Sequence, residues 1–262
     1  MSFIVNPYWY ASAGCADADA NAFLTATGIT DPTISGGICT LVTSLKAQSL
    51  WTKMYAIYPF VGGTATTHKF NLKNPADTNA AYRLSFVGGW THSANGALPN
   101  GTNGYANTNL NIANNLILTN HSFGIYSRTN QVGGNFVYGG FDGGAYFLQN
   151  NYGAGNFVSG AVGNIVSYTA NPSTNLLMGS RTAVNAFRGY RGTTLLATNT
   201  VNIGALPPVV FFLGARNNNG SPVFYNSIEY AFAFLGEGLS TTEQPIFHSI
   251  VQTFQTTLSR QV

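Results

Sequence analysis

The chain has 262 residues and a net charge of +3, and only 7% of its residues are charged. Soluble proteins average about 25% charged residues, so the polarity here comes from uncharged side chains and from 30 glycines. No apolar stretch reaches the roughly 18 residues of a membrane-spanning helix, and no basic cluster indicates nucleic-acid binding. A surface so poor in charge favours dry contacts, which is typical of an assembly component or a binding module; a stable secreted domain is the alternative.

The first ten residues contain no basic region followed by an apolar run, so no secretory signal is expected. Tyr8, Trp9 and Tyr10 form an aromatic cluster. Buried aromatic side chains dominate interface energetics, which makes this cluster a candidate assembly contact. The alternative is that the cluster covers an edge of the chain's own sheet.

Two helices are predicted next. Asp17 and Asp19 are capping residues for a helix that stops at Gly28, and Asp31-Pro32 opens a second helix with an apolar face. Cys15 and Cys39 could pair. Without a secretory signal, we interpret them as two buried thiols.

From Met54 onward, turn residues recur about every 8–12 positions, which predicts many short strands in a sandwich or barrel. The predicted strands lie at Met54–Phe60, Tyr82–Val87, Ser122–Arg128, Phe136–Phe141, Ala145–Gln149, Asn164–Tyr168, Leu176–Thr182, Ala186–Arg191, Thr194–Thr198, Val209–Ala215 and Ile228–Leu235. In the last of these, alternation places Ile228, Tyr230, Phe232 and Phe234 on one face.

A helix is predicted after the strands. Ser240 and Glu243 have the spacing of a capping box. The helix carries an apolar stripe, and Arg260 lies in its last turn, where a cation is favourable. The stripe consists of Ile246, Ile250, Val251, Phe254 and Leu258. No linker divides the chain, so we predict one domain, with an arm and helices over 1–53, a β-sandwich over 54–236 and a helix over 240–260.

Four segments of the last third resemble the closing strands of concanavalin A-like and laminin-G-like jelly rolls. They are Phe212–Arg216, Phe224–Ile228, Tyr230–Leu235 and Gly238–Glu243. The resemblance covers only the end of the chain. It implies a mainly β protein, a jelly-roll β-sandwich with N-terminal helices and a C-terminal helix.

A second resemblance, spread over most of the chain, is to a group of bacteriophage structural proteins. It is carried by Ile57–Gly63, Asn71–Pro75, Phe86–His92, Gly96–Gly101 and Gln252–Leu258. It implies a virion protein, such as a decoration, head-fibre or tail component, in a particle assembled in the host cytoplasm. Its partners would be other virion proteins and copies of itself. The family supplies no catalytic residue, metal or cofactor.

The resemblance to jelly rolls makes the acidic residues candidates for catalysis, because that fold also includes glucanases. Glycoside hydrolysis normally needs two carboxylates flanking one bond, and the eight acids here include no paired motif on one strand. The four histidines have no nucleophile motif beside them. We therefore expect no enzyme activity, with a glycoside hydrolase as a disfavoured alternative. Asp77 with Asn74 and Asn79, or Asp142 among glycines, could hold calcium, but Asx turns explain them as well.

Glycan binding is the main alternative to a purely structural role. The Gly-rich stretch Gly88–Asn111 offers aromatic rings and side-chain amides, which is the chemistry of sugar sites. The candidate contacts for a host-surface glycan or another partner are Trp90, His92, Asn103, Tyr105 and Asn107. Packing within the loops, or contact between subunits, would use the same residues.

Overall fold

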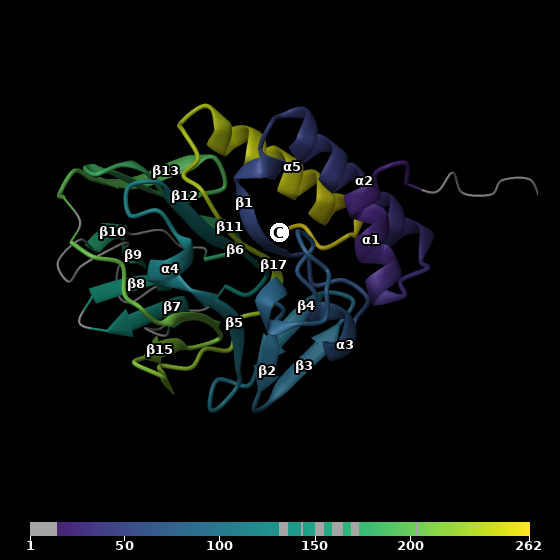
Figure 1. The fold of residues 1–262 in the computed structure, drawn as a ribbon, viewed down its shortest axis with the longest axis horizontal. Helices are drawn as coiled ribbons and strands as arrows, with labels where there is room; N and C mark the ends of the chain where they lie inside the picture. The colour runs from purple at the N-terminus through teal and green to yellow at the C-terminus, as the bar shows by residue number, and fades with distance from the viewer. Residues whose placement is uncertain are drawn as a thin grey trace, which may run out of the picture.

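The computed structural model describes residues 15–130, 136–142, 144–149, 155–158, 165–168, 173–202 and 204–262. Helices α1 (Ala18–Thr27), α2 (Pro32–Ala47) and α5 (Glu243–Thr257) cover one face of a β-sheet, and a second sheet packs on its other face (Figure 1). These layers confirm the predicted mainly β sandwich with N-terminal helices and a C-terminal helix. β1 begins at Met54 and β17 ends at Gly236, and the interpretation of the chain as one domain with bounds at 53, 54 and 236 stays a prediction.

The first sheet has the order β13-β12-β11-β6-β17-β4-β3, and β1 also pairs with β17. Its strands are β1 (Met54–Tyr58), β3 (Trp90–Ser93), β4 (Gly96–Pro99), β6 (His121–Ser127), β11 (Asn175–Ala183), β12 (Ala186–Arg191), β13 (Thr194–Asn199) and β17 (Tyr230–Gly236).

The second sheet has the order β10-β9-β8-β7-β14-β5-β2, and the hairpin of β15 and β16 joins it through β7. Its strands are β2 (Ser85–Val87), β5 (Tyr105–Asn111), β7 (Phe136–Asp142), β8 (Gly144–Gln149), β9 (Gly155–Val158), β10 (Ile165–Tyr168), β14 (Val210–Leu213), β15 (Arg216–Asn218) and β16 (Ser221–Val223). Four short elements complete the described fold: η1 (Trp51–Lys53), α3 (Ala65–His68), η2 (Asn79–Ala81) and α4 (Ile112–Asn115).

Two apolar cores lie on opposite faces of the first sheet. The core between the sheets includes Phe123, Ile125 and Phe211, and the core under the helices includes Phe232 and Phe247. Both faces of β17 are therefore buried, which explains the nearly continuous apolar character of that strand.

The alternation predicted for Ile228–Leu235 is wrong after Tyr230. Opposite β6, Tyr230 pairs with Ser127 and Phe232 pairs with Tyr126, so Ala231 is an extra residue in a β-bulge. After the bulge, the residues that continue the alternation point to the opposite face of the sheet. As a result Tyr230 faces the other sheet, whereas Phe232 and Phe234 face the helices.

The predicted helix caps are confirmed. The Asp17 carboxylate accepts hydrogen bonds from the amides of Asp19 and Ala20, and Gly28 ends α1 with φ of 66°. The capping box also forms, because Ser240 N donates to Glu243 Oε2 (2.9 Å) and Glu243 N donates to Ser240 Oγ (3.2 Å).

The interpretation of the cysteines as thiols is wrong. Cys15 and Cys39 form a disulfide, with their Cα atoms 5.5 Å apart. The expected redox compartment favours thiols, but α1 packs against α2 and brings the two cysteines together.

Two expectations for the last helix also need correction. Ile246 is 39% exposed, and Phe247 is buried in its place, because the helix presents Phe247, Val251 and Phe254 to the sheet. Arg260 does not lie in the last turn of the helix: α5 ends at Thr257, and Arg260 follows it as a buried residue, 1% exposed.

Candidate functional site

The predicted loop contacts lie at one end of the sandwich, on β3, β5 and the loop before β5. Trp90 is half-buried, and its Nε1 donates to the carbonyl oxygens of Val87 and Tyr105, both at 3.2 Å. Its ring packs against Phe86 and Tyr230, at centroid distances of 5.1 and 6.1 Å. The indole is therefore mainly a packing element of this end.

Its neighbours are also engaged internally. His92 Nδ1 lies 2.9 Å from His68 Nδ1, and burial lowers the pKa of His68 to about 3, so this pair is neutral at pH 7. The Asn103 carbonyl oxygen accepts from Gly89 N (3.0 Å), and that of Asn107 accepts from Asn109 N (2.7 Å). The Tyr105 ring packs on Phe212 at 4.7 Å. The role of these five residues as glycan contacts stays a prediction, and Tyr8, Trp9 and Tyr10 lie outside the described residues.

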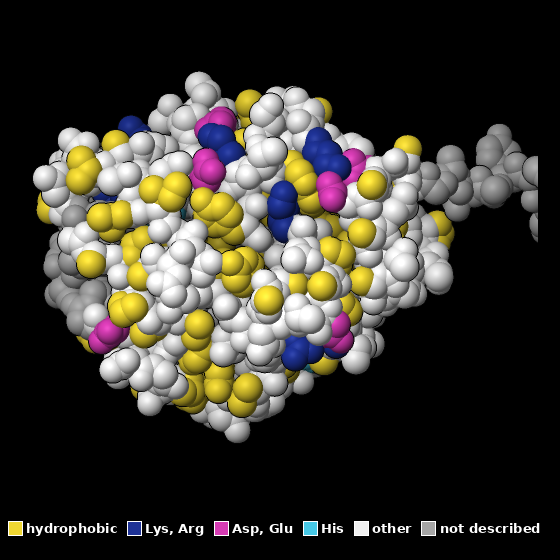
Figure 2. All heavy atoms as spheres, in the orientation of Figure 1, with side chains coloured by type: hydrophobic (Ala, Val, Ile, Leu, Met, Phe, Trp, Pro, Cys, Tyr) yellow, Lys and Arg dark blue, Asp and Glu magenta, His cyan; other side chains and the backbone are white. Residues whose placement is uncertain are grey.

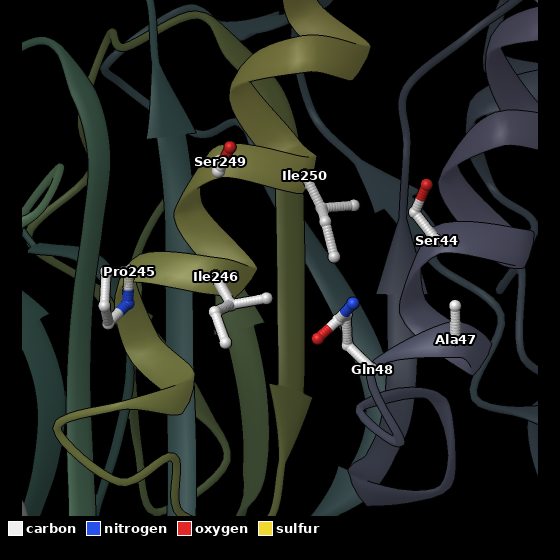
Figure 3. A pocket seen from close by; sticks show the side chains of 7 residues that line it. All are labelled: Ser44, Ala47, Gln48, Pro245, Ile246, Ser249 and Ile250. Carbon is white, nitrogen blue, oxygen red and sulfur yellow. The ribbon is translucent and has the colours of Figure 1, made fainter.

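One hollow of the described surface lies between α2 and α5 and has a volume of about 540 Å³. Figure 3 shows Ile246 and Ile250 of α5 on one side of it, and Ser44 of α2 and Gln48, the residue after α2, on the other. We call this the helix groove. Its lining has no charged and no aromatic side chain, and it suits protein packing better than the recognition of a small polar ligand.

A second hollow, of about 480 Å³, has a different chemistry. Its volume is within the usual range for small-ligand pockets. It is formed by β1, the turn Asn71–Asn74 that follows α3, η2 with the residue after it, and α4. We call it the Asn–Tyr pocket, lined by Met54, Tyr55, Asn71, Lys73, Asn74, Ala80, Tyr82, Asn114 and Asn115.

Asn71 holds the walls of this pocket together. It is buried, and its carbonyl oxygen accepts from the amides of Ile57 (2.9 Å) and Lys73 (3.0 Å). Its NH₂ group donates to the carbonyl oxygens of Ala81 (3.0 Å) and Tyr55 (3.3 Å). One side chain thus links β1, the turn Asn71–Asn74 and η2 in a fixed geometry.

Tyr82 forms a second fixed wall. Its φ of 56° is in the left-handed region, which a bulky side chain adopts only under local constraint. Its backbone oxygen accepts from Tyr58 Oη (2.6 Å), and its own hydroxyl donates to Asn115 Oδ1 (2.5 Å). Asn115 Nδ2 in turn donates to Asn111 O (2.8 Å), so the ring is held in place from both ends. Backbone strain of this kind is often found at functional sites.

Other polar groups around the pocket remain available for a ligand. Within the described residues the Tyr55 hydroxyl and the Asn114 side-chain amide make no hydrogen bond, and Asn74 uses only its carbonyl oxygen. Burial and the charge of Glu237 raise the pKa of Tyr55, so its hydroxyl stays protonated. The pocket thus offers donors and acceptors beside two aromatic rings.

Lys73 adds a positive charge to this set. Its Nζ donates to Trp51 O (2.8 Å) and lies 3.8 Å from the centroid of the Trp51 ring. Burial lowers the pKa of Lys73 to about 8, with Asp19 opposing and Lys46 adding to the shift.

Most of the acidic residues that were candidates for catalysis or calcium binding form ion pairs with lysine or arginine. Asp77 Oδ2 lies 2.6 Å from Lys69 Nζ and its Oδ1 2.7 Å from Arg83, while Glu229 lies 2.6 Å from Arg128. Figure 2 shows small groups of opposite charge on an otherwise uncharged face. Within the described part of the chain, no three His, Cys, Asp or Glu residues come together as a metal site would require. None of the helices described there has the length and apolar character that crossing a bilayer requires.

No family model matches the sequence, and no curated protein matches it. Solved structures do match the fold. The botulinum neurotoxin serotype D binding domain is 11% identical with a TM-score of 0.51, over 77% of this chain and 52% of the other. A mutant of Trypanosoma rangeli sialidase with trans-sialidase activity is 13% identical with a TM-score of 0.50, over 86% and 39%. The NanB sialidase of Streptococcus pneumoniae is 15% identical with a TM-score of 0.41, over 52% and 25%.

The chain therefore spans about half or less of the chains named here. At these identities the two matches with TM-scores of 0.50 and 0.51 show a likeness of fold alone, and the two packed sheets place this chain in the class of mainly β sandwiches. None of the three matched structures named above is a phage protein.

Proposed function

We propose that this chain is a non-catalytic binding module that recognises a glycan or a glycosylated receptor through the Asn–Tyr pocket. The observation that carries the proposal is the lining of that pocket, where two tyrosine rings lie beside uncommitted amide and hydroxyl groups. Sugars carry hydroxyl groups around a ring whose faces expose apolar C–H groups. Such a ligand is matched by aromatic surface and by groups that both donate and accept hydrogen bonds.

The rigidity of the pocket supports a binding role. Asn71, Tyr82 and Asn115 are fixed by hydrogen bonds before any ligand arrives. A preformed site loses less conformational entropy on binding. The matched toxin structure is described as a binding domain, which agrees with this use of a sandwich fold.

The absence of catalysis is part of the same proposal. The pocket lining contains no carboxylate, and hydrolysis of a glycosidic bond normally needs two. Glu237, whose charge helps to raise the pKa of Tyr55, is not part of the lining and accepts a hydrogen bond from Asn120 (3.3 Å).

Glycan-array screening followed by calorimetry tests the site. Tyr55→Phe and Asn114→Ala each remove a polar group that the fold does not use, so we expect about tenfold weaker binding per lost hydrogen bond with unchanged thermal stability. The matched control is Tyr105→Ala, at the predicted loop contact. If Tyr105→Ala abolished binding while both pocket variants bound normally, the site would lie in the loops instead.

A structural role in an assembly is the second candidate, and the helix groove favours it. Solvent-facing helix surfaces normally carry charged residues, yet the groove is lined by Ser, Ala, Gln, Pro and Ile. A second copy of the chain is the occupant that fits, because two uncharged faces can pack without burying a charge. A phage virion, with copies of itself and other virion proteins as partners, is one such assembly.

Light scattering across a concentration series tests that role. Ile246→Lys places a charge in the groove, and it should turn an oligomer into monomers. Ile117→Lys is the matched control, since Ile117 is an exposed isoleucine outside the groove. A wild-type chain that stays monomeric at every concentration would remove this candidate.

A further inference from the structure

Lys73 differs from the other lysines of the chain. Lys46 pairs with Asp17 at 2.7 Å, Lys53 with Glu243 at 2.5 Å and Lys69 with Asp77 at 2.6 Å. Within the described residues Lys73 has no carboxylate partner, although its side chain is half-buried. The other three lysines of the sequence form ion pairs, whereas Lys73 lines the Asn–Tyr pocket and its ammonium group donates to a carbonyl oxygen.

The ammonium group has unused hydrogen-bonding capacity. It carries three N–H donors, and one of them is taken by Trp51 O. The Trp51 ring beneath it holds the cation in place without neutralising it. A ligand carboxylate that reached Nζ would form a charge-assisted hydrogen bond in partly desolvated surroundings, where such bonds are strongest.

We infer that the ligand of the Asn–Tyr pocket is an acidic glycan, one whose carboxylate binds Lys73 while its hydroxyl groups contact Tyr55 and Asn114. This inference rests on the proposed function and specifies the class of sugar. The Asn74 amide lies on the same turn as Lys73 and lines the same pocket, so it is placed to donate to the second carboxylate oxygen.

The pocket's charge balance agrees with this assignment. Asp19 of α1 and Lys46 of α2 are the charged groups that act on Lys73, with opposite signs, and Lys46 is itself paired with Asp17 and Asp19. Glu237 acts on Tyr55, at another part of the pocket. The site is therefore polarised, and a ligand with one anionic end and a neutral body has a defined orientation in it.

The test compares uronic-acid and sialic-acid oligosaccharides with their methyl esters, which keep the sugar and remove the negative charge. The wild-type chain should bind the acids about tenfold more tightly than the esters. Lys73→Gln should bind the acid and the ester equally, and Lys73→Arg should keep the preference. Lys69→Gln is the matched control, because Lys69 is paired with Asp77 outside the pocket, and it should behave as the wild type.

Measuring the preference for the acid over the ester as a function of pH separates ligand binding by Lys73 from a purely structural role, which would leave that preference independent of pH. Since burial lowers the pKa of Lys73 to about 8, the preference for the acid should disappear as the pH rises through that value. In Lys73→Arg it should persist. Equal binding of acid and ester by the wild type would overturn this inference but leave the proposed function intact. Failure to bind any glycan, charged or neutral, would overturn both.

Discussion

The side chain of Arg260 makes four hydrogen bonds inside the described fold. It is buried, and its guanidinium donates to Phe60 O (2.8 Å), Pro59 O (3.1 Å) and Ala231 O (3.0 Å). Its Nε also donates to Gln255 Oε1 (3.0 Å). One residue near the end of the chain thus satisfies carbonyl groups of the turn after β1 and of the bulge in β17.

Removing this side chain should be costly. Arg260→Ala leaves buried carbonyl oxygens without donors, and we expect a loss of about 3 kcal/mol or more in the free energy of unfolding. Urea denaturation measures it. Arg83→Ala is the matched control, because its ion pair with Asp77 is partly exposed and should contribute less than about 1 kcal/mol. Equal losses in both variants would contradict this role for Arg260.

The helix ends and the bulge show how far local sequence patterns extend. The helix caps follow from the sequence, because each capping residue contacts neighbours only a few positions away. These residues are Asp17, Gly28, Asp31 and Ser240. The bulge at Ala231 depends on the register against β6, about a hundred residues earlier, which alternation along one strand does not contain. The burial of Arg260 depends on Phe60 in the same way.

At the scale of elements, α1 has a small share of the core. It buries only Ala20 and Phe23. Its other attachments are the disulfide from Cys15 to Cys39 and the ion pairs of Lys46 with Asp17 and Asp19. The attachment of α1 to α2 therefore depends strongly on a covalent bond.

Loss of that bond should loosen α1 selectively. For a sequence separation of 24 residues, the double variant Cys15→Ser/Cys39→Ser should lose about 3 kcal/mol of stability. Hydrogen exchange should increase in α1 more than in α5, which is packed by Phe247, Val251 and Phe254. Unchanged exchange in α1 would show that the apolar contacts and ion pairs are sufficient.

At the scale of the whole molecule, buried histidines couple stability to pH. Burial lowers the pKa of His68 and of His121 to about 3, and it also lowers the pKa values of His92 and His248. The unfolded chain, in which these groups have pKa values near 6.5, therefore binds more protons than the folded chain between about pH 3 and 6.5.

Stability should consequently be fully present above pH 6.5 and should fall as the pH drops towards 3. Thermal unfolding followed from about pH 8 down to about pH 4 should show a midpoint that decreases below about pH 6.5. A midpoint that stays constant over this range would contradict the assignment of these histidines as neutral and buried.

The whole molecule also explains why the Asn–Tyr pocket was not predicted. Tyr55, Lys73, Tyr82 and Asn114 come from four separate segments, and only the tertiary fold brings them together. Two signals were present in the sequence: the pair Asn114-Asn115, and Asn71 with Asn74 around a lysine. The Gly88–Asn111 stretch predicts a site because its aromatic and amide residues lie close together in the sequence, yet the fold uses many of their polar atoms internally.

The position of β17 has a consequence for how the protein is made. This strand lies inside its sheet, with β6 on one side and β1 and β4 on the other, but it is the last strand in the chain. Until the ribosome has released Gly236, β6 and β1 lack their shared neighbour and expose unpaired edges. This sheet can therefore be completed only after Gly236 has been synthesised, and until then β6 and β1 expose edges with which another strand could pair.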